Sequence, residues 1–299
     1  MLEPSAPLRI CSAAAFDVAF ALSAGTLLNR LWLGKSSTPA SDKQLRWWLI
    51  GCSGLLLVAI PSQLILLAAS MTGDLSWKLA WSSLSDVVTT HAGRSVAMSF
   101  CFAPFLLVLS LRPAAFRRSA GIWTGIALIL ALTADRATLG HAASDGDFSF
   151  RELAQFLHLS AIVVWAGGVA IAGLTVVPHL AGRSKSEELI QFATRLSRTV
   201  TVALVLVVLS GAYNAWRGLG GSLMPLPRTA WGKVLCLKII VVLLALSCGS
   251  RVRLWVWEKR KSGSGSLDLI QRWLRVEALL MIAILILSAW LANLPPADM

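Results

Sequence analysis

The chain has 299 residues, of which 56% are hydrophobic and only 14% are charged, and its mean hydropathy is +0.71. A soluble domain of this length has roughly a quarter of its residues charged, so the composition excludes an ordinary soluble protein and indicates one that lies in lipid. The net charge of +12 would suit a nucleic-acid-binding protein, but the position of the basic residues along the chain has to be considered first.

Apolar stretches long enough to cross a bilayer, about 20 residues each, recur along the whole chain. We expect eight transmembrane helices, at 10–32, 48–71, 95–111, 121–140, 153–177, 199–216, 233–254 and 274–292. The connections are too short for a soluble domain of normal size. The prediction is therefore an all-α, polytopic membrane protein with a single domain over 1–299, with helices 1–4 in 1–140 and helices 5–8 in 141–299.

The basic residues explain the charge. The connections 30–46, 112–118, 183–198 and 251–275 hold 18 of the 27 lysines and arginines. Connections rich in Lys and Arg stay in the cytoplasm, so both termini are predicted on the outer, periplasmic side. The charge is thus a topology signal with membrane lipid as the partner, and we expect no binding to nucleic acid.

A short pattern occurs twice. The segment "VVTTHAGRSV" (87–96) leads into the third stretch, and "PLPRTAWGKVL" (225–235) leads into the seventh. Thr-x-x-Gly followed by a cation begins at Thr90 and again at Thr229, 139 residues later. One interpretation is two parallel halves of four helices, a known membrane architecture. The alternative is a common helix start with Thr as the N-cap.

Histidine and sulfur residues indicate a possible metal. On the predicted topology, His91, His141, His158 and Met98 lie towards the outer side. Imidazole with sulfur is a ligand set that suits copper, and sulfur favours Cu(I). The five cysteines occur singly and form no CxxC, so neither a disulfide framework nor a zinc site is indicated. A single Met or Cys is more often a packing residue, and a lone His at a helix end more often a hydrogen-bonding one.

His141 and His158 differ from the other two histidines because a short loop joins the helices that carry them. Adjacent antiparallel helices bring both rings towards one pocket. His158 also lies about one turn inside the fifth stretch, where an imidazole without a partner is costly. The two are therefore the leading candidates for a shared metal site.

Polar residues within the spans suggest a path for an ion, because such residues are rare in lipid. Asp135 and Arg136 lie in the fourth stretch, where they either neutralise charges or line a polar route. Ser210, Asn214 and Arg217 follow one another at i, i+4 and i+7, on one helical face. That face is expected to meet protein or water rather than lipid.

Four segments resemble the bacterial copper resistance protein D (CopD) family: "GHAA" (140–143), "FLHLSAIVVWAGGV" (156–169), "RLSRTVTVALVLVVLSGAYNAW" (195–216) and "TAWGKVLCLK" (229–238). The resemblance covers residues 138–255 well and the first four spans in outline. It implies an eight-helix protein of the bacterial inner membrane that moves copper from periplasm to cytoplasm, often beside a small periplasmic CopC-type carrier. It maps His141 and His158 onto the family's histidines; other matched positions are Trp165, Gly168, Asn214, Thr229 and Lys233.

One departure from the family concerns the residues before His158. Related proteins often have an acidic residue there, whereas this chain has Ala154 and Gln155. A carboxylate that would orient the imidazole is missing locally, unless Glu152 supplies it.

The leading hypothesis is a copper transporter or channel, with Cu(I) or Cu(II) as the ion. One alternative is an electron carrier that binds haem b between His141 and His158, since helical bundles use histidines as axial ligands. Another is a chaperone or assembly factor that hands copper to an oxidase. No HExxH, GxSxG or phosphate-binding loop is present, so we expect no enzyme. The oligomeric state is left open.

Overall fold

The computed structural model describes residues 6–72, 77–139, 149–182, 186–262 and 267–295. Over these residues the secondary structure is helical, and strands are absent from this part of the chain. Eight of the helical segments are long and apolar enough to cross a membrane. The predicted all-α fold with eight spans is therefore confirmed.

The spans follow one another in chain order. The first four are α1 (Ala6–Leu33), α2 (Pro39–Thr72), α5 (His91–Leu111) and α7 (Ser119–Ala137). The fifth span is continuous but consists of α8 (Phe150–Ile162), η3 (Val163–Gly167), α9 (Gly168–Ile171), η4 (Ala172–Val176) and α10 (Val177–Ala181). The last three are α11 (Ser186–Gly218), α12 (Ala230–Ser262) and α13 (Leu267–Ala292). Short elements lie between spans: η1 (Gly34–Ser36), α3 (Trp77–Ser82), α4 (Leu84–Thr89) and α6 (Pro113–Arg117).

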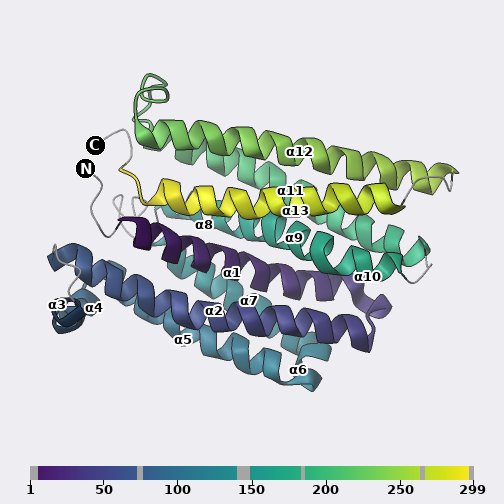
Figure 1. Ribbon diagram of the computed structural model, residues 1–299, viewed down its shortest axis with the longest axis horizontal. Helices are drawn as coiled ribbons and strands as arrows, with labels where there is room; N and C mark the ends of the chain where they lie inside the picture. Colours follow the sequence, from purple (N-terminus) through teal and green to yellow (C-terminus); the bar gives the residue numbers. More distant parts are fainter. Residues whose placement is uncertain (1–5, 73–76, 140–148, 183–185, 263–266, 296–299) are drawn as a thin grey trace.

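The two ends of the bundle differ in charge. Helix α1 begins and α13 ends at the same end, which we call the terminal end (Figure 1). The opposite end, which we call the basic end, carries η1, α6 and the last turn of α10. Arg30, Lys35 and Arg117 lie in the last turns of helical segments at that end. By the positive-inside rule the basic end is expected in the cytoplasm.

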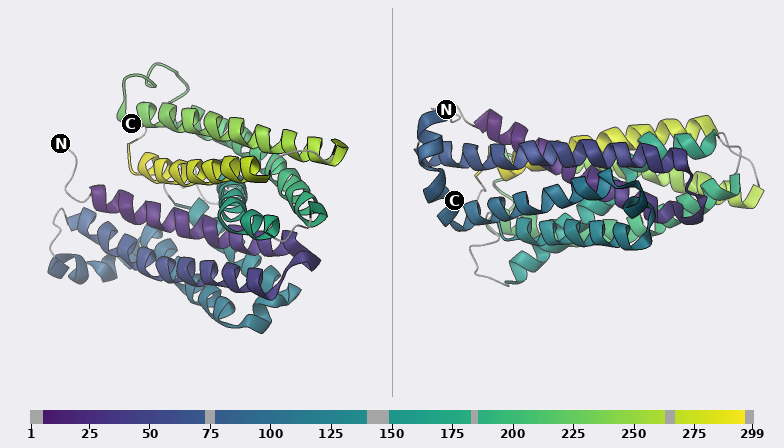
Figure 2. Two further views of the ribbon diagram at one scale, coloured as in Figure 1. Left: turned by 45° about the vertical axis from the view of Figure 1, so that its right-hand side comes forward. Right: turned by 90° about the horizontal axis from the view of Figure 1, so that it is seen from below.

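Two helices form the centre of the bundle. The apolar window of the fifth span is 83% buried by protein and that of α1 is 56% buried, whereas the other six are 39% buried or less. The two central helices cross where Gly25 meets Gly167, and a Cβ on Gly167 would overlap the Ala21 carbonyl oxygen. Small residues allow such close approach of helix backbones in membranes. The left view of Figure 2 shows α1 between α2 and α13.

The fifth span departs from regular α-helix twice. Its η3 and η4 segments are π-helical turns, which contain one residue more than an α-turn. Such bulges are frequent at functional sites. The first of them contains Trp165 and the crossing residue Gly167.

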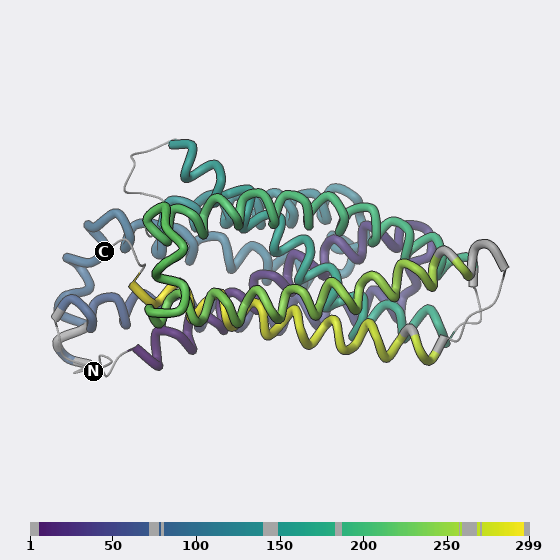
Figure 3. Tube along the Cα trace, turned by 90° about the horizontal axis from the view of Figure 1, so that it is seen from above, coloured from purple at the N-terminus to yellow at the C-terminus, as the bar shows by residue number. Residues whose placement is uncertain are grey.

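The outer helices fall into two groups along the sequence. Helices α2, α5 and α7 lie on the side of α1, and α11, α12 and α13 lie on the side of the fifth span (Figures 1 and 3). In the first group α2 packs closely along α5. In the second group α12 packs closely along α13 but touches α11 only lightly. The second group is therefore the more open of the two.

The repeated Thr-x-x-Gly pattern has the same local structure at both places. The Thr90 hydroxyl accepts a hydrogen bond from the Gly93 backbone N–H at 3.0 Å, and Thr229 does the same for Gly232 at 3.0 Å. A Cβ on either glycine would overlap the backbone six residues earlier, at Val87 or Leu226. This likeness supports two related halves, and it equally satisfies the simpler interpretation of two capped helix starts.

Polar contacts at the basic end fasten the first group together and join it to the fifth span. The buried Asp42 forms ion pairs with Arg30 at 2.7 Å and with Arg117 at 3.4 Å. The Thr38 hydroxyl lies 3.1 Å from Nε2 of His179 in α10. His179 is therefore engaged in a structural hydrogen bond between the α1–α2 turn and the fifth span.

Candidate functional site: a half-buried histidine and its polar surroundings

His158 lies inside the bundle, between α8 and α11. Its Nδ1 is 3.0 Å from the Ser210 hydroxyl, and the ring lies against Gly211, where a Cβ would come within 3.0 Å of Cε1. Glycine at this position therefore leaves room for the ring. His158 is eight residues beyond the start of α8 at Phe150, or about 12 Å along the helix at 1.5 Å per residue.

The hydrogen bonds of Ser210 favour a neutral His158 with its proton on Nδ1. Ser210 donates its one hydroxyl hydrogen to the Leu206 carbonyl in the preceding turn of α11. Its oxygen then accepts from Nδ1–H of His158. In that tautomer the lone pair is on Nε2, and the backbone of Val207 in α11 provides the ring with a second hydrogen bond. A neutral imidazole held in one tautomer by a second group is the usual form of a histidine metal ligand.

One charged residue from another span lies near His158, and a second charged residue lies near that one. Lys238 in α12 is within electrostatic range of the imidazole, and Asp17 in α1 attracts Lys238. Lys238 is also eight residues from the start of its helix, at Ala230, so it lies at about the same depth as His158. Asp17 lies eight residues before the crossing residue Gly25, and His158 nine before Gly167; the π-turn accounts for the extra residue. The two side chains thus occupy matching positions on the two central helices.

The predicted polar pair in α7 is divided between different partners. The carboxylate of Asp135 accepts hydrogen bonds from Ser95 at 2.8 Å and from Ser99 at 2.6 Å, both in α5. Arg136 forms an ion pair with Asp17 at 3.5 Å, donates to Gln63 at 3.0 Å and stacks over a phenylalanine ring. Both side chains are therefore well satisfied within the first four spans.

The predicted stripe on α11 lies partly against α8. Ser210 meets His158, and one turn further the amide of Asn214 donates to the Gln155 side-chain oxygen at 2.9 Å. Arg217 is exposed near the end of α11. Ser210 and Asn214 thus face protein, as expected from the sequence, and Gln155 uses its side chain on Asn214.

The other predicted ligands are not brought to His158 in the part of the chain that is described. His91 is exposed at the start of α5, and Met98 is 56% exposed on the outside of the bundle. His141 lies outside the described residues. Trp165 is buried in η3, seven residues beyond His158 on the same span. Among the described residues no group of three or more His, Cys, Asp or Glu is close enough to hold a metal ion.

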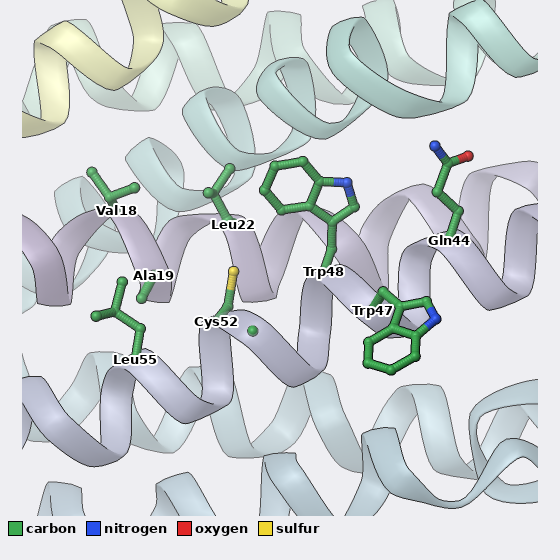
Figure 4. Close-up of a pocket in the computed structure, with 9 residues that line it drawn as sticks. Val18, Ala19, Leu22, Gln44, Trp47, Trp48, Cys52 and Leu55 are labelled. Atoms are coloured by element: carbon green, nitrogen blue, oxygen red, sulfur yellow. The ribbon is translucent and has the colours of Figure 1, made fainter.

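The structure contains two notable cavities. One of about 440 Å³ lies between α1 and α2, lined by Trp48, Cys52 and other mostly apolar side chains (Figure 4). It contains none of the predicted site residues. A smaller cavity of about 90 Å³ lies between α11, α12, α13 and the fifth span, towards the basic end, and Trp165 and Glu277 are among its lining residues.

Sequence reasoning missed three ionisable residues inside spans: Asp17, Lys238 and Glu277. Asp17 and Glu277 lie outside the motifs, and Lys238 is the last residue of the segment 229–238 but was not singled out within it. The available signal was their position alone, since an ionisable side chain well inside an apolar stretch marks a candidate functional position.

The fold and these residues together define a class of protein. Eight apolar spans that contain several ionisable residues are the architecture of a multi-pass membrane protein with polar positions in its interior. The N-terminal domain of the Copper resistance protein D-like family matches residues 1–150, and the Copper resistance protein D family itself matches residues 190–291. The chain belongs to the copper resistance protein D family.

One curated relative is the copper transport protein CutJ of Bacillus subtilis (strain 168), 28% identical over 284 residues. The match covers 93% of this chain and 51% of that protein, so the chain spans about half the length of the curated relative it matches. No solved structure matches the chain. The chain is thus a multi-pass bacterial membrane protein of a copper-related family.

Proposed function

We propose that the protein carries copper ions across the membrane that it spans, with His158 as a ligand on the route. Membership of the copper resistance protein D family supports copper as the substrate. The observation that supports the proposal is the half-buried His158–Ser210 pair, in which Nδ1 is engaged by the hydroxyl and Nε2 is the nitrogen proposed to bind the metal. A single imidazole is an incomplete site, and we propose His141, on the connection before α8, as its partner.

Inward movement is the direction that the electrostatics favour. If the terminal end faces the periplasm, the membrane potential draws a cation towards the basic end, by about 2.3 kcal/mol per charge per 100 mV. A CopC-type carrier is then the proposed donor at the terminal end. Charge balance near His158 is compatible with passage, since Asp17 offsets the positive charge of Lys238.

Copper uptake by sealed vesicles tests the proposal. Purified protein is reconstituted, copper is added outside under reducing conditions, and the internal metal is measured over time. Wild type should exceed empty vesicles, His158→Ala should lose the difference, and His179→Ala should retain it. His179 is the matched control because its ring is engaged by Thr38 at the basic end.

The same experiment separates the alternatives. Copper binding without uptake would contradict transport and favour a chaperone that passes copper to another protein. A haem absorption band in the purified protein would favour the electron carrier. In the described part of the chain, His158 is the one histidine in a span interior, so the second axial ligand would have to be His141.

A further inference from the structure

The small cavity near the basic end has an unusual wall. Most of its lining is apolar and comes from the fifth span, α11 and α12. Two charged side chains also line it: Glu277 from α13 and Arg253 from α12. The cavity lies where α11 and α12 touch only lightly. A carboxylate is therefore placed in an apolar chamber between loosely packed helices.

Glu277 is buried yet has no fixed partner. The residue is 5% exposed, and within the described chain its carboxylate forms no hydrogen bond and no ion pair. It lies against the backbone of α12, where a Cβ on Gly249 would approach Oε1 to 2.8 Å. Glycine at 249 leaves the space that the carboxylate occupies. The fold thus leaves space for the Glu277 side chain but provides no hydrogen bond or ion pair to its carboxylate within the described residues.

Such a carboxylate needs a positive charge from elsewhere. Glu277 is six residues from the start of the last apolar segment at Gln271, or about 9 Å along the helix. At that depth an ionised group without a partner is expensive. It is relieved either by a proton or by a bound cation.

The surrounding titratable groups do not remove this need. From α12, Arg253 and Cys248 lie within electrostatic range of Glu277, but Arg253 does not reach ion-pairing distance. The lining residues of α11 and the fifth span are uncharged. Elsewhere on the elements packed against α13, Arg30 is paired with Asp42 and His179 is bonded to Thr38. Asp17 of α1 interacts with Arg136 and Lys238 nearer the terminal end.

The cavity and the His158 site lie along the same face of α11. On α11, Ala193, Ser197, Val200 and Leu204 line the cavity. Continuing that spacing by three to four residues leads to Val207 and then Ser210, the partner of His158. On the fifth span, the cavity-lining residue Trp165 lies in the π-helical turn η3, seven residues after His158. One interface between the fifth span and α11 therefore connects the imidazole with the carboxylate's chamber.

We propose that Glu277 is an exchange site, holding a proton when the cavity is empty and releasing it when the transported cation arrives from His158. This inference rests on the proposed function and adds the coupling ion to it. The step balances as a protonated carboxyl plus one monovalent cation giving a carboxylate–cation pair plus one proton. Because one carboxylate neutralises one charge at a time, proton and cation occupy the site alternately. This one-for-one exchange moves no net charge, so the copper and proton gradients drive the coupled cycle, whereas the membrane potential acts only on a cation that passes without exchange.

The test measures copper and protons together. Vesicles containing the full-length protein and a trapped pH indicator are given Cu(I), with the membrane potential clamped by potassium and valinomycin. Wild type should show sustained proton movement opposite to copper uptake. Glu277→Gln should lose the proton movement while still binding Cu(I) in detergent with wild-type affinity. Glu187→Gln, an equivalent change at an exposed position on α11, should behave as wild type.

A second variant retains the carboxylate but crowds it. Gly249→Ala places a methyl group against Oε1 and should slow copper uptake, whereas Gly54→Ala, with open space around it, should not. Copper uptake without proton movement in wild type, or proton movement that persists in Glu277→Gln, would overturn the inference and leave copper transport intact. No copper uptake by wild type would instead overturn the proposed function, and the exchange site with it.

Discussion

Spans 1–4 and spans 5–8 share the same type of capped helix start but differ in the contacts of their interior polar side chains. Both contain the same capped Thr-x-x-Gly helix start, and both contribute one helix to the central crossing. In the first group the charged pair on α7 is satisfied by its neighbours: Asp135 is bound by two serines, and Arg136 by Asp17 and Gln63. In the second group, among the described residues, His158 offers the nitrogen proposed to bind the metal and Glu277 keeps an unpaired carboxylate.

The contrast separates the work of the two groups. Side chains that are fully hydrogen-bonded stabilise a helix bundle, whereas those left with a vacant lone pair or charge can bind an exchangeable ion. The light contact between α11 and α12 leaves space for such an ion, and the close packing of α2 on α5 does not. We therefore interpret the first group as the support and the second as the route.

The largest effect is expected where the two groups cross. Gly167→Ala forces a methyl group into the Ala21 carbonyl. Overpacking of this kind costs about 1–3 kcal/mol and occasionally more, and backbone atoms cannot move aside as a side chain can. Thermal unfolding in detergent should show a large loss of stability. Gly51→Ala, which meets nothing within 4 Å, is the control, and equal stability of the two variants would contradict the close crossing.

Asp135→Asn examines the interpretation of the first group as support. The change disturbs the hydrogen bonds from Ser95 and Ser99 and should lower the free energy of unfolding by about 1–3 kcal/mol. Copper uptake per folded molecule should be almost unchanged. If the folded variant instead loses uptake, Asp135 belongs to the ion path, as the sequence also allowed, and the division between the groups fails.

Ser210→Ala probes the interpretation of the second group as the route. Without the hydroxyl, Nδ1–H of His158 loses the oxygen that fixes the tautomer. Loss of such an orienting partner lowers metal affinity about tenfold to a hundredfold, so a competition titration should show weaker Cu(I) binding. Ser247→Ala on α12, where an exposed hydroxyl bonds only within its own helix, should leave the affinity unchanged.

The smallest effect concerns the feature that the two groups share. Thr90→Ala and Thr229→Ala each remove an N-cap hydrogen bond of 3.0 Å to a glycine N–H. Each should cost about 1 kcal/mol of stability, measured by the same unfolding assay. A clear inequality between the two would weaken the case for two related halves.

The spans were predictable because about 20 consecutive apolar residues leave few alternatives to a membrane helix. Motif spacing also placed Ser210 and Asn214 on a protein-facing side of α11, since a fixed helical period determines that face. The division of α11 from α12, and the cavity between them, depends on side-chain packing between distant segments, which periodicity does not report.

Pairings across the bundle were the other limit. Asp17, Lys238 and Glu277 lie in three different spans that no local spacing relates, so the proximity of Lys238 to His158 and to Asp17, and of Glu277 to a cavity, follows only from the tertiary arrangement. Conversely, Met98 was singled out by its sulfur, but its exposure on the outside of α5 depends on helix rotation. The residue types in the sequence identified candidate ligands, but only the tertiary packing shows which of them lie close together.

The most direct measurement is a Cu(I) titration of the purified protein in detergent against a competing chelator. Wild type, His158→Ala and His179→Ala would be compared under identical conditions. The account predicts that His158→Ala weakens binding by roughly tenfold or more, which is about 1.4 kcal/mol, while His179→Ala binds as wild type does. Equal affinity of all three proteins would contradict it, because the half-buried imidazole would then not be a copper ligand.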